Sequence, residues 1–417
     1  MPDTATLRTS VVERFLRYVA YDTQSDPSSS TRPSTAKQLV LLDLLVEELK
    51  ALGCADAKRD EQGIVVATLP ATSRKARVPV IGFVAHVDTS PEMSGAGVAP
   101  IVHRGWQGGD IALPDEPSAV LRPAEIPALR ARVGHDIITA SGGTLLGADD
   151  KSGVAAIMAA VEHLAQHPEI AHGAIRVAFT PDEEIGSGVD HFDVARFGAR
   201  CAYTLDGEGV GELQTETFSA DSLTVTFHGF NAHPGYAKGK MINSIKVAAD
   251  FIGRLPKDGL SPETTTGRDG FVHPNDVDAT VDQTSVHFII RDFATPGLAE
   301  KEAFLTQLAR DAAAAWGATV SVQVRESYRN MRPVLDRDPE VVEYAREAIR
   351  RAGLEPVETP IRGGTDGSRL SYMDLPTPNL SSGQHNFHSR LEWVSAQDME
   401  KAVETILHLC RIWEERA

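Results

Sequence analysis

Apolar and polar positions along the first half of the chain follow two different periods. The segment "VPVIGFVAHVD" from Val78 is apolar on both faces, which is typical of a buried strand in a parallel sheet. "AIRVAFT" and "CAYTLDG" have the same character. Between the first two of these segments, Val154, Ile157, Met158 and Val161 form an apolar stripe at helical spacing. Strands that alternate with helices predict an α/β fold with a mostly parallel central sheet flanked by helices.

Other helices are indicated by their end signals. Ser10 and Glu13 have the spacing of a capping box, which predicts a helix beginning near Ser10. A second helix is predicted over residues 35–52, with Gly53 as its C-terminal stop. A final amphipathic helix is expected around Val403.

The pattern changes after Gly211. "SLTVTFHG" alternates between apolar and polar residues, as half-buried strands do. It is followed by a predicted helix, two strands, a second helix and the strand "ATVSVQV"; the four intervening elements fall near residues 241–255, 277–283, 285–292 and 298–316. The order β-α-β-β-α-β is that of a compact ferredoxin-like α+β unit.

These segments predict a main domain that is interrupted by a smaller one. We expect the main α/β domain to consist of residues 1–212 and 327–417. The inserted ferredoxin-like domain is expected to cover residues 213–326. A chain of 417 residues exceeds the usual size of one domain, which agrees with this division.

Composition narrows the possible partners and the compartment. The net charge of −17, from 58 acidic and 41 basic residues, disfavours nucleic acid as a partner. Three cysteines, an odd number, argue against a disulfide framework and favour a reducing compartment. No signal-peptide pattern and no run of about 18 apolar residues is present, so no membrane association is expected. The sequence predicts a soluble cytoplasmic protein.

Acids and histidines gather where the predicted strands end. In an α/β sheet, binding groups collect at the carboxyl ends of the strands. Each residue also has an ordinary structural explanation, since acids such as Asp149 and Asp150 are favoured at helix N-termini. Burying so many carboxylates without cations would be costly, and divalent metal ions would offset that cost. The residues that share this placement are His86, Asp88, Asp149, Glu183, Glu184, Asp206, His385 and His388.

Histidine and carboxylate ligands without thiolates suit zinc, and also cobalt or manganese. The set is large enough for two metal ions that share one carboxylate, and Asp149 is the expected bridge. His86 and Asp206 would complete one metal site, and Glu184 and His388 the other.

Glu183 is the carboxylate that this division of ligands leaves over. Neighbouring side chains of an extended segment point in opposite directions, so Glu183 and Glu184 are expected to have different roles. A carboxylate that lies beside two cations without binding them is suited to act as a general base. This arrangement predicts metal-assisted hydrolysis of an amide.

Several longer motifs resemble those of a known enzyme family. "AHVDTSPE", "LLGADDKSGVA", "FTPDEEIGSG", "IRGGTDGSRLS" and "NFHSRLEWV" are similar, in order and from about residue 80 to 395, to the peptidase T family of tripeptide aminopeptidases. That family is a branch of the co-catalytic zinc exopeptidases that carries a small inserted lid domain. The resemblance implies that residues 213–326 form the lid and that the other two segments form the catalytic domain.

The resemblance also implies roles for individual residues. It implies two zinc ions and a cis peptide bond after Asp149, with Glu183 as general base and Asp88 as the partner of His86. The ligands that it implies are His86, Asp149, Glu184, Asp206 and His388. Short peptides with a free N-terminus, tripeptides above all, are the implied substrates.

Four further residues are expected to contact the substrate. In this family His233 is placed to support the oxyanion, although a turn residue before Pro-Gly is the alternative reading of the sequence. Arg291 and Arg362 have the chemistry to hold a peptide carboxylate, with a structural ion pair as the alternative. Asn386 is a further contact candidate because it lies close to His388.

Two departures from the family pattern predict an altered pocket edge. Glu208 stands where a glycine is usual, and Ser389-Arg390 stands where Gly-Lys is commoner. Alternatives to a tripeptide aminopeptidase are a related dipeptidase, carboxypeptidase or N-acyl-amino-acid deacylase, or a peptide-binding relative without catalysis. Because lid domains in related enzymes sometimes mediate dimers, the resemblance also suggests a homodimer.

Overall fold

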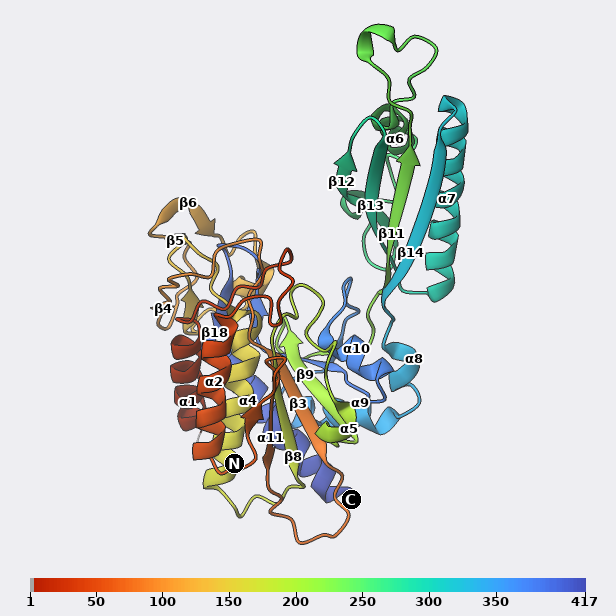
Figure 1. The fold of residues 1–417 in the computed structure, drawn as a ribbon. Coiled ribbons are helices and arrows are strands. Elements are labelled where there is room, and N and C mark those ends of the chain that lie inside the picture. Colours follow the sequence, from red (N-terminus) through yellow and green to blue (C-terminus); the bar gives the residue numbers. More distant parts are fainter. Residues whose placement is uncertain (1–3) are drawn as a thin grey trace. The chain divides into compact units, whose positions relative to one another are not determined.

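The computed structural model describes residues 4–417, and the chain forms two compact units (Figure 1). Unit 1 contains the described residues up to Thr215 together with Met331–Thr359 and Thr365–Ala417. Unit 2 contains Glu216–Asn330 and Pro360–Gly364. The sequence placed the two divisions after residues 212 and 326, and it assigned residues 360–364 to the main domain.

Unit 1 is built on an eight-stranded sheet. Its strand order is β1-β2-β8-β3-β9-β16-β10-β15. The four strands at its centre, β8, β3, β9 and β16, run parallel to their neighbours in this group. The bounds of the eight strands are β1 Lys58–Arg59, β2 Val65–Leu69, β3 Ile81–His86, β8 Ile175–Thr180, β9 Cys201–Gly207, β10 Glu212–Gln214, β15 Val357–Glu358 and β16 Asn379–Ser381. The predicted mostly parallel sheet is confirmed, and all six residues of β3 are buried.

Helices cover both faces of this sheet. Helix α4 packs on β3 and β9, with α1 and α11 beside it (Figure 1). On the opposite face, Phe197 of α5 and Leu370 of α10 pack against Val84 of β3 and Ala202 of β9. The helices of unit 1 are α1 Thr4–Tyr18, α2 Gln38–Ala51, α3 Pro127–Arg130, α4 Ala148–Gln166, α5 Val194–Phe197, α8 Arg332–Leu335, α9 Pro339–Arg351, α10 Asp366–Tyr372 and α11 Ala396–Glu415.

One predicted helix end is wrong. Helix α1 already begins at Thr4, so Ser10 lies within it and does not cap it. The Ser10 hydroxyl instead donates to the Glu162 carboxylate on α4, at 2.5 Å. The capping-box spacing therefore misplaced the helix end, because Ser10 satisfies its hydroxyl with a residue on a neighbouring helix. The predicted stop of the second helix is confirmed, with Gly53 in the left-handed region at φ +96°.

A smaller sheet in unit 1 was not predicted. Its strand order is β17-β18-β7-β4, and each neighbouring pair is antiparallel. Next to it, Trp106, Leu113, Leu121 and Trp393 belong to one apolar cluster. The strands are β4 Ile101–His103, β7 Ile137–Thr139, β17 Gln384–His385 and β18 Trp393–Ser395, and a separate hairpin consists of β5 Ile111–Leu113 and β6 Glu116–Leu121.

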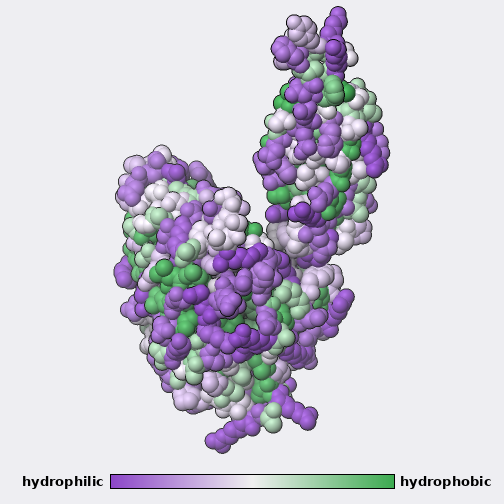
Figure 2. Space-filling view, viewed as in Figure 1, coloured by the Kyte–Doolittle hydropathy of each residue, from purple (hydrophilic) through white to green (hydrophobic). Residues whose placement is uncertain are grey.

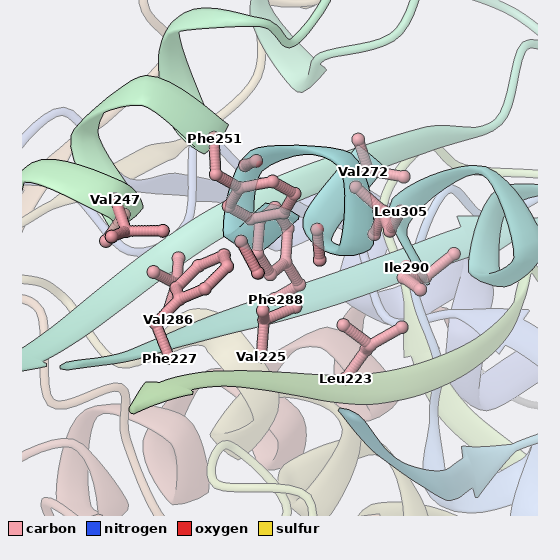
Figure 3. Packing of buried hydrophobic residues seen from close by; sticks show 14 of the residues in the cluster. Leu223, Val225, Phe227, Val247, Phe251, Val272, Val286, Phe288, Ile290 and Leu305 are labelled. Atoms are coloured by element: carbon pink, nitrogen blue, oxygen red, sulfur yellow. The ribbon is translucent and has the colours of Figure 1, made fainter. Parts of the chain in front are cut away.

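Unit 2 has the predicted order β-α-β-β-α-β. Its four strands form one antiparallel sheet in the order β12-β13-β11-β14. Apolar side chains on one face of this sheet pack against α6 and α7, and Phe227, Phe251 and Phe288 lie in this core (Figure 3). The elements are β11 Ser219–His228, α6 Ser244–Gly253, β12 Phe271–Ala279, β13 Gln283–Asp292, α7 Thr295–Trp316 and β14 Thr319–Tyr328, with 3-10 turns at Pro234–Tyr236 and Pro262–Thr264.

The first strand of the central hairpin in unit 2 begins earlier than predicted. β12 starts at Phe271 instead of near residue 277, and the chain turns at residues 280–282. A register shift between Pro274 and Asp276 interrupts its alternation, which hides the strand from a period-two search.

Charged and polar residues are spread over the visible face of both units (Figure 2). Within residues 4–417, no helix has the length and apolar character needed to cross a membrane.

Candidate metal centre

The parallel strands of unit 1 bring the predicted ligands to one edge of the sheet. His86 is the last residue of β3, and Asp206 lies near the end of β9. Glu184 follows the end of β8, and Asp149 lies at the start of α4. His388 comes from the loop between β17 and β18. Segments far apart in the sequence therefore contribute to one cluster.

Asp149 occupies the middle of this cluster. Its Oδ1 lies 3.0 Å from His86 Nε2, and its Oδ2 lies 3.4 Å from His388 Nε2. On the His86 side, Asp206 Oδ1 is 3.7 Å from His86 Nε2. On the other side, Glu184 Oε2 is 2.8 Å from His388 Nε2. The two oxygens of one carboxylate thus face two separate pairs of nitrogen and oxygen donors.

The donor atoms lie close enough together to share cations. Single donor atoms of His86, Asp149 and Glu184 all lie within 4.8 Å of one another, and the same holds for His86, Asp150 and Asp206. The set contains imidazole nitrogens and carboxylate oxygens but no thiolate, which is the chemistry of zinc, cobalt or manganese sites. Glu184 Oε1 is buried and has no hydrogen-bond partner, so a donor is left for a cation.

The raised pKa values in the cluster indicate that positive charge at this site is stabilising. Burial raises the pKa of Glu184 to about 8 and that of Asp206 to about 6, and the charge of Asp149 adds to both shifts. Burial lowers the pKa of His388, but Asp149 and Glu184 outweigh this effect and raise it to about 11. Burial also opposes the charged form of His86, whose pKa the surrounding carboxylates nevertheless raise well above its usual value. Protons on the two histidines supply positive charge that metal ions would replace.

Asp88 connects His86 with the segment that carries the two glutamates. Its two carboxylate oxygens accept the backbone N–H groups of Glu183 at 2.9 Å and Glu184 at 3.2 Å. His86 Nδ1 lies 3.1 Å from the backbone oxygen of Asp88 and 3.4 Å from its carboxylate. Asp88 is fully buried, so this connection is shielded from solvent.

Glu183 and Glu184 lie in a turn, whereas the sequence predicted an extended segment. The turn is closed by the Gly186 N–H, which donates to the Glu183 carbonyl at 2.7 Å. The two side chains still differ in their contacts. Glu184 reaches His388, and no described residue donates a hydrogen bond to the Glu183 carboxylate. Burial raises the pKa of Glu183 well above its usual value.

The segment around these glutamates is fixed by its neighbour Asp182. The Asp182 carboxylate accepts bonds from the backbone and hydroxyl of Ser34 and from the Gln38 side chain, at 2.5 to 2.7 Å. Asp182 is therefore a structural residue of this loop. Of the two candidate histidines, His385 is buried and stacks on Trp393 at 4.2 Å, so His388 is the one in the cluster.

Three acids at the site were not predicted. Asp150 accepts the backbone N–H groups of His86 and Gly153. Glu92 Oε2 lies 2.7 Å from His388 Nδ1. Glu392 accepts three backbone N–H groups of residues 146–149. All three acids lie inside motifs noted in the sequence, but contacts to backbone amides and to a distant histidine have no spacing signature there.

The residues predicted to contact substrate fall into both units. In unit 2, His233 Nδ1 accepts the Gly235 N–H at 3.2 Å, which is the contact of a turn residue. Arg362 donates to the backbone oxygens of Gly267 and Asp269. In unit 1, Asn386 has a left-handed backbone with φ +54°.

Arg291 retains unused hydrogen-bonding capacity. Its Nη1 donates to the Arg362 carbonyl at 3.0 Å, whereas its buried Nε has no hydrogen-bond partner. The substrate roles of all four residues stay predictions.

The two departures from the family pattern make local contacts. Glu208 Oε1 lies 3.4 Å from His385 Nδ1. The Ser389 hydroxyl donates to the Asn386 carbonyl at 2.6 Å, and Arg390 pairs with Glu116 at 3.2 Å. The bond from Ser389 closes the loop that carries His388.

Known proteins resemble this chain over its full length. A family model described as Peptidase family M20/M25/M40 matches residues 139–411. The chain is 49% identical over 412 residues to Peptidase T of Geobacillus kaustophilus (strain HTA426), covering 99% of this chain and 100% of the relative. The crystal structure of aminopeptidase PepT from Bacillus cereus ATCC 10987 has a TM-score of 0.74 at 23% identity, covering 98% of this chain and 99% of that one. The YXEP protein of Bacillus subtilis, described as a dinuclear metal binding peptidase from M20 family, has a TM-score of 0.66 at 16% identity, with 99% and 100% covered.

Proposed function

The chain belongs to peptidase family M20/M25/M40, and we propose that it is a metal-dependent aminopeptidase that removes the N-terminal residue from tripeptides. Identity of about one half to a protein named Peptidase T, over the full length of both chains, supports this activity. Within the site, the proposal rests on the position of Asp149. One of its carboxylate oxygens faces His86 and the other faces His388, so that one carboxylate lies between two potential metal sites.

Two divalent cations fit this arrangement, and zinc is the proposed metal, with cobalt or manganese as substitutes. His86 and Asp206 would hold one ion, Glu184 and His388 the other, and Asp149 would bind both. When bound, such ions would increase the acidity of water and polarise the carbonyl of the scissile amide. Asp88 keeps its contacts with His86 and with the segment of the two glutamates, and thereby orients that histidine.

Glu183 is the proposed general base. Its carboxylate makes no hydrogen bond to a described residue, and the positive charge of bound cations would oppose the burial that raises its pKa, so that it can accept a proton from the attacking water. The same proton is then donated to the nitrogen of the leaving amine as the C–N bond breaks. The products are a free amino acid and a dipeptide. Asp88 accepts the backbone N–H groups of both glutamates. This fixes the position of the Glu183 backbone next to that of the proposed ligand Glu184.

We further propose that unit 2 acts as a lid that supplies substrate contacts. His233 would support the oxyanion, and Arg291 and Arg362 would hold the peptide carboxylate. The unpaired Nε of Arg291 supports this role, because a buried donor without a partner favours a ligand that accepts its bond. Asn386 would contact the substrate from unit 1.

The cytoplasm is the proposed location, which agrees with three buried cysteines that form no disulfide. We also propose a homodimer that forms through the lid, and a measurement of mass in solution would test it.

Hydrolysis of three simple peptides tests the proposed activity. The zinc-loaded enzyme should release alanine from Ala-Ala-Ala faster than from Ala-Ala, and it should leave acetylated Ala-Ala-Ala intact. Preference for Ala-Ala would indicate a dipeptidase, and preference for the acetylated peptide would indicate a deacylase or carboxypeptidase. A protein that binds two zinc ions per chain but hydrolyses none of the three would be a binding relative.

A further inference from the structure

Glu392 lies buried beside the metal centre without contacting any predicted ligand side chain. Glu392 is 1% exposed, and within residues 4–417 its carboxylate is hydrogen-bonded only to backbone amides. Oε2 accepts the N–H groups of Leu146 at 2.6 Å and Gly147 at 2.7 Å. Oε1 accepts the N–H of Asp149 at 3.0 Å. One carboxylate therefore satisfies three amides within four consecutive residues.

The segment that Glu392 binds cannot satisfy these amides by itself. Gly147 is in the left-handed region at φ +79°, and Asp149 is not helical, with φ −79° and ψ 110°. The regular hydrogen bonds of α4 therefore begin only after this segment. Buried amides without a partner destabilise the fold, so an acceptor from elsewhere in the chain is needed. Glu392 is that acceptor.

Glu392 also joins the two segments that carry the central ligands. It follows His388 by four residues in the sequence, and its N–H donates to the Ser389 carbonyl at 3.3 Å. Its side chain accepts the backbone N–H of Asp149. Glu392 thus connects the loop that carries His388 directly to the backbone of Asp149.

We propose that Glu392 is a positioning residue that holds Asp149 between the two metal sites. The proposal rests on the metal centre proposed above. Because each Asp149 oxygen faces a different pair of donors, a shift of its backbone would disturb both sites at once. Loss of Glu184 or Asp206 would instead affect one site. If Glu392 has this role, its substitution should therefore lower the affinity for both metal ions together.

The test compares Glu392→Gln with the parent protein by zinc titration against a fluorescent chelator. The glutamine keeps the size of the side chain but replaces one acceptor oxygen with a donor group. Both zinc affinities are expected to fall by about 10- to 100-fold, the usual effect of losing a group that orients a metal ligand. Undiminished affinity at both sites, in a folded variant, would overturn the proposal.

A matched control separates positioning from general loss of stability. The Asp56 carboxylate accepts the N–H of Thr68 at 2.8 Å, near the end of the sheet opposite the metal centre. Asp56→Asn should bind both zinc ions as the parent does, whatever its melting temperature. If Asp56→Asn lost zinc as strongly as Glu392→Gln, the effect would be one of stability and the proposal would be wrong.

Two further measurements keep the test decisive. If Glu392→Gln does not fold by circular dichroism, Glu392→Asp takes its place; this variant keeps the charge on a shorter chain and should bind both ions more weakly than the parent. Equal binding by Glu392→Asp would then contradict the proposal. A parent protein that binds no zinc, cobalt or manganese would overturn the metal centre itself, which is a different outcome from normal binding by the variants.

Discussion

The Asp88 carboxylate accepts the backbone N–H of Glu183 at 2.9 Å, and its second oxygen accepts the next amide in the chain. The strand that ends in His86 is thereby tied to the loop that follows β8. The predicted ligand Glu184 and the predicted base Glu183 both depend on this one buried side chain for the position of their backbone.

Asp88→Asn should weaken this connection without removing a ligand. An asparagine side chain has one acceptor oxygen, so one of the two amides loses its bond and faces an N–H₂ group instead. We expect activity on Ala-Ala-Ala to fall by about 10- to 100-fold with the fold retained. Steady-state kinetics and circular dichroism measure the two effects. An unchanged kcat/KM would show that Asp88 does not position the glutamates.

Glu183→Gln should separate metal binding from catalysis. The glutamine cannot accept a proton, so we expect kcat to fall by about 10²- to 10⁴-fold while both metals stay bound. Metal analysis of the purified variant, together with its kcat, checks this result. Loss of a zinc ion from Glu183→Gln would contradict the division of roles between the two glutamates.

Glu184→Ala is the neighbouring change with the opposite expectation. Its carboxylate lies 2.8 Å from His388 Nε2, so its removal takes a donor from one side of Asp149 only. One of the two zinc ions should bind more weakly, and the other should bind as before. A variant that still holds both zinc ions tightly would exclude Glu184 as a ligand.

Metal binding should release protons at neutral pH. In the metal-free centre the surrounding carboxylates raise the pKa of His388 to about 11 and that of His86 well above its usual value, so both imidazoles carry protons at pH 7. Zinc requires their deprotonated forms, and its affinity should therefore rise with pH over this range. Calorimetry in buffers of different ionisation enthalpy should give about two or more protons released per chain. Binding without proton release would contradict these raised pKa values.

Glu302 predicts a pH dependence of stability in unit 2. Burial and a hydrogen bond shared with Asp221 raise its pKa from 4.5 to about 7. Between these two values the folded chain binds more protons than the unfolded chain, so this group's contribution to the free energy of unfolding decreases as pH rises. Glu302→Gln should flatten that decrease. Chemical denaturation of both proteins at pH 5 and pH 7.5 tests it, and equal slopes would exclude Glu302 as the cause.

Regular elements were the most predictable part of this molecule. Strand β9 coincides with the predicted segment "CAYTLDG" because a run that is apolar on both faces has one stable place, the middle of a covered sheet. The positions at which helices and strands begin and end were less predictable. The capping-box spacing of Ser10 and Glu13 misplaced the start of the helix that begins at Thr4, since Ser10 lies inside that helix and bonds to Glu162 of another helix.

Those residues of the candidate site that lie at the ends of strands were predictable from the sequence. His86 and Asp206 come from adjacent parallel strands, so their proximity follows from the order of the sheet. The roles of Glu392 and Glu92 could not be predicted from the sequence, for a physical reason. Their partners are backbone amides and a ring nitrogen on other segments, and such contacts exist only once the chain has folded.

The separation of Asp149 and His388 in the sequence has a consequence for the newly made protein. Unit 2 and the segments after it are synthesised between these two residues. A nascent chain that has emerged only as far as unit 2 holds His86, Asp149, Glu184 and Asp206 but lacks His388. Because the proposed ligand His388 is made so late, the proposed peptide-cleaving activity would begin only after the loop between β17 and β18 has been synthesised.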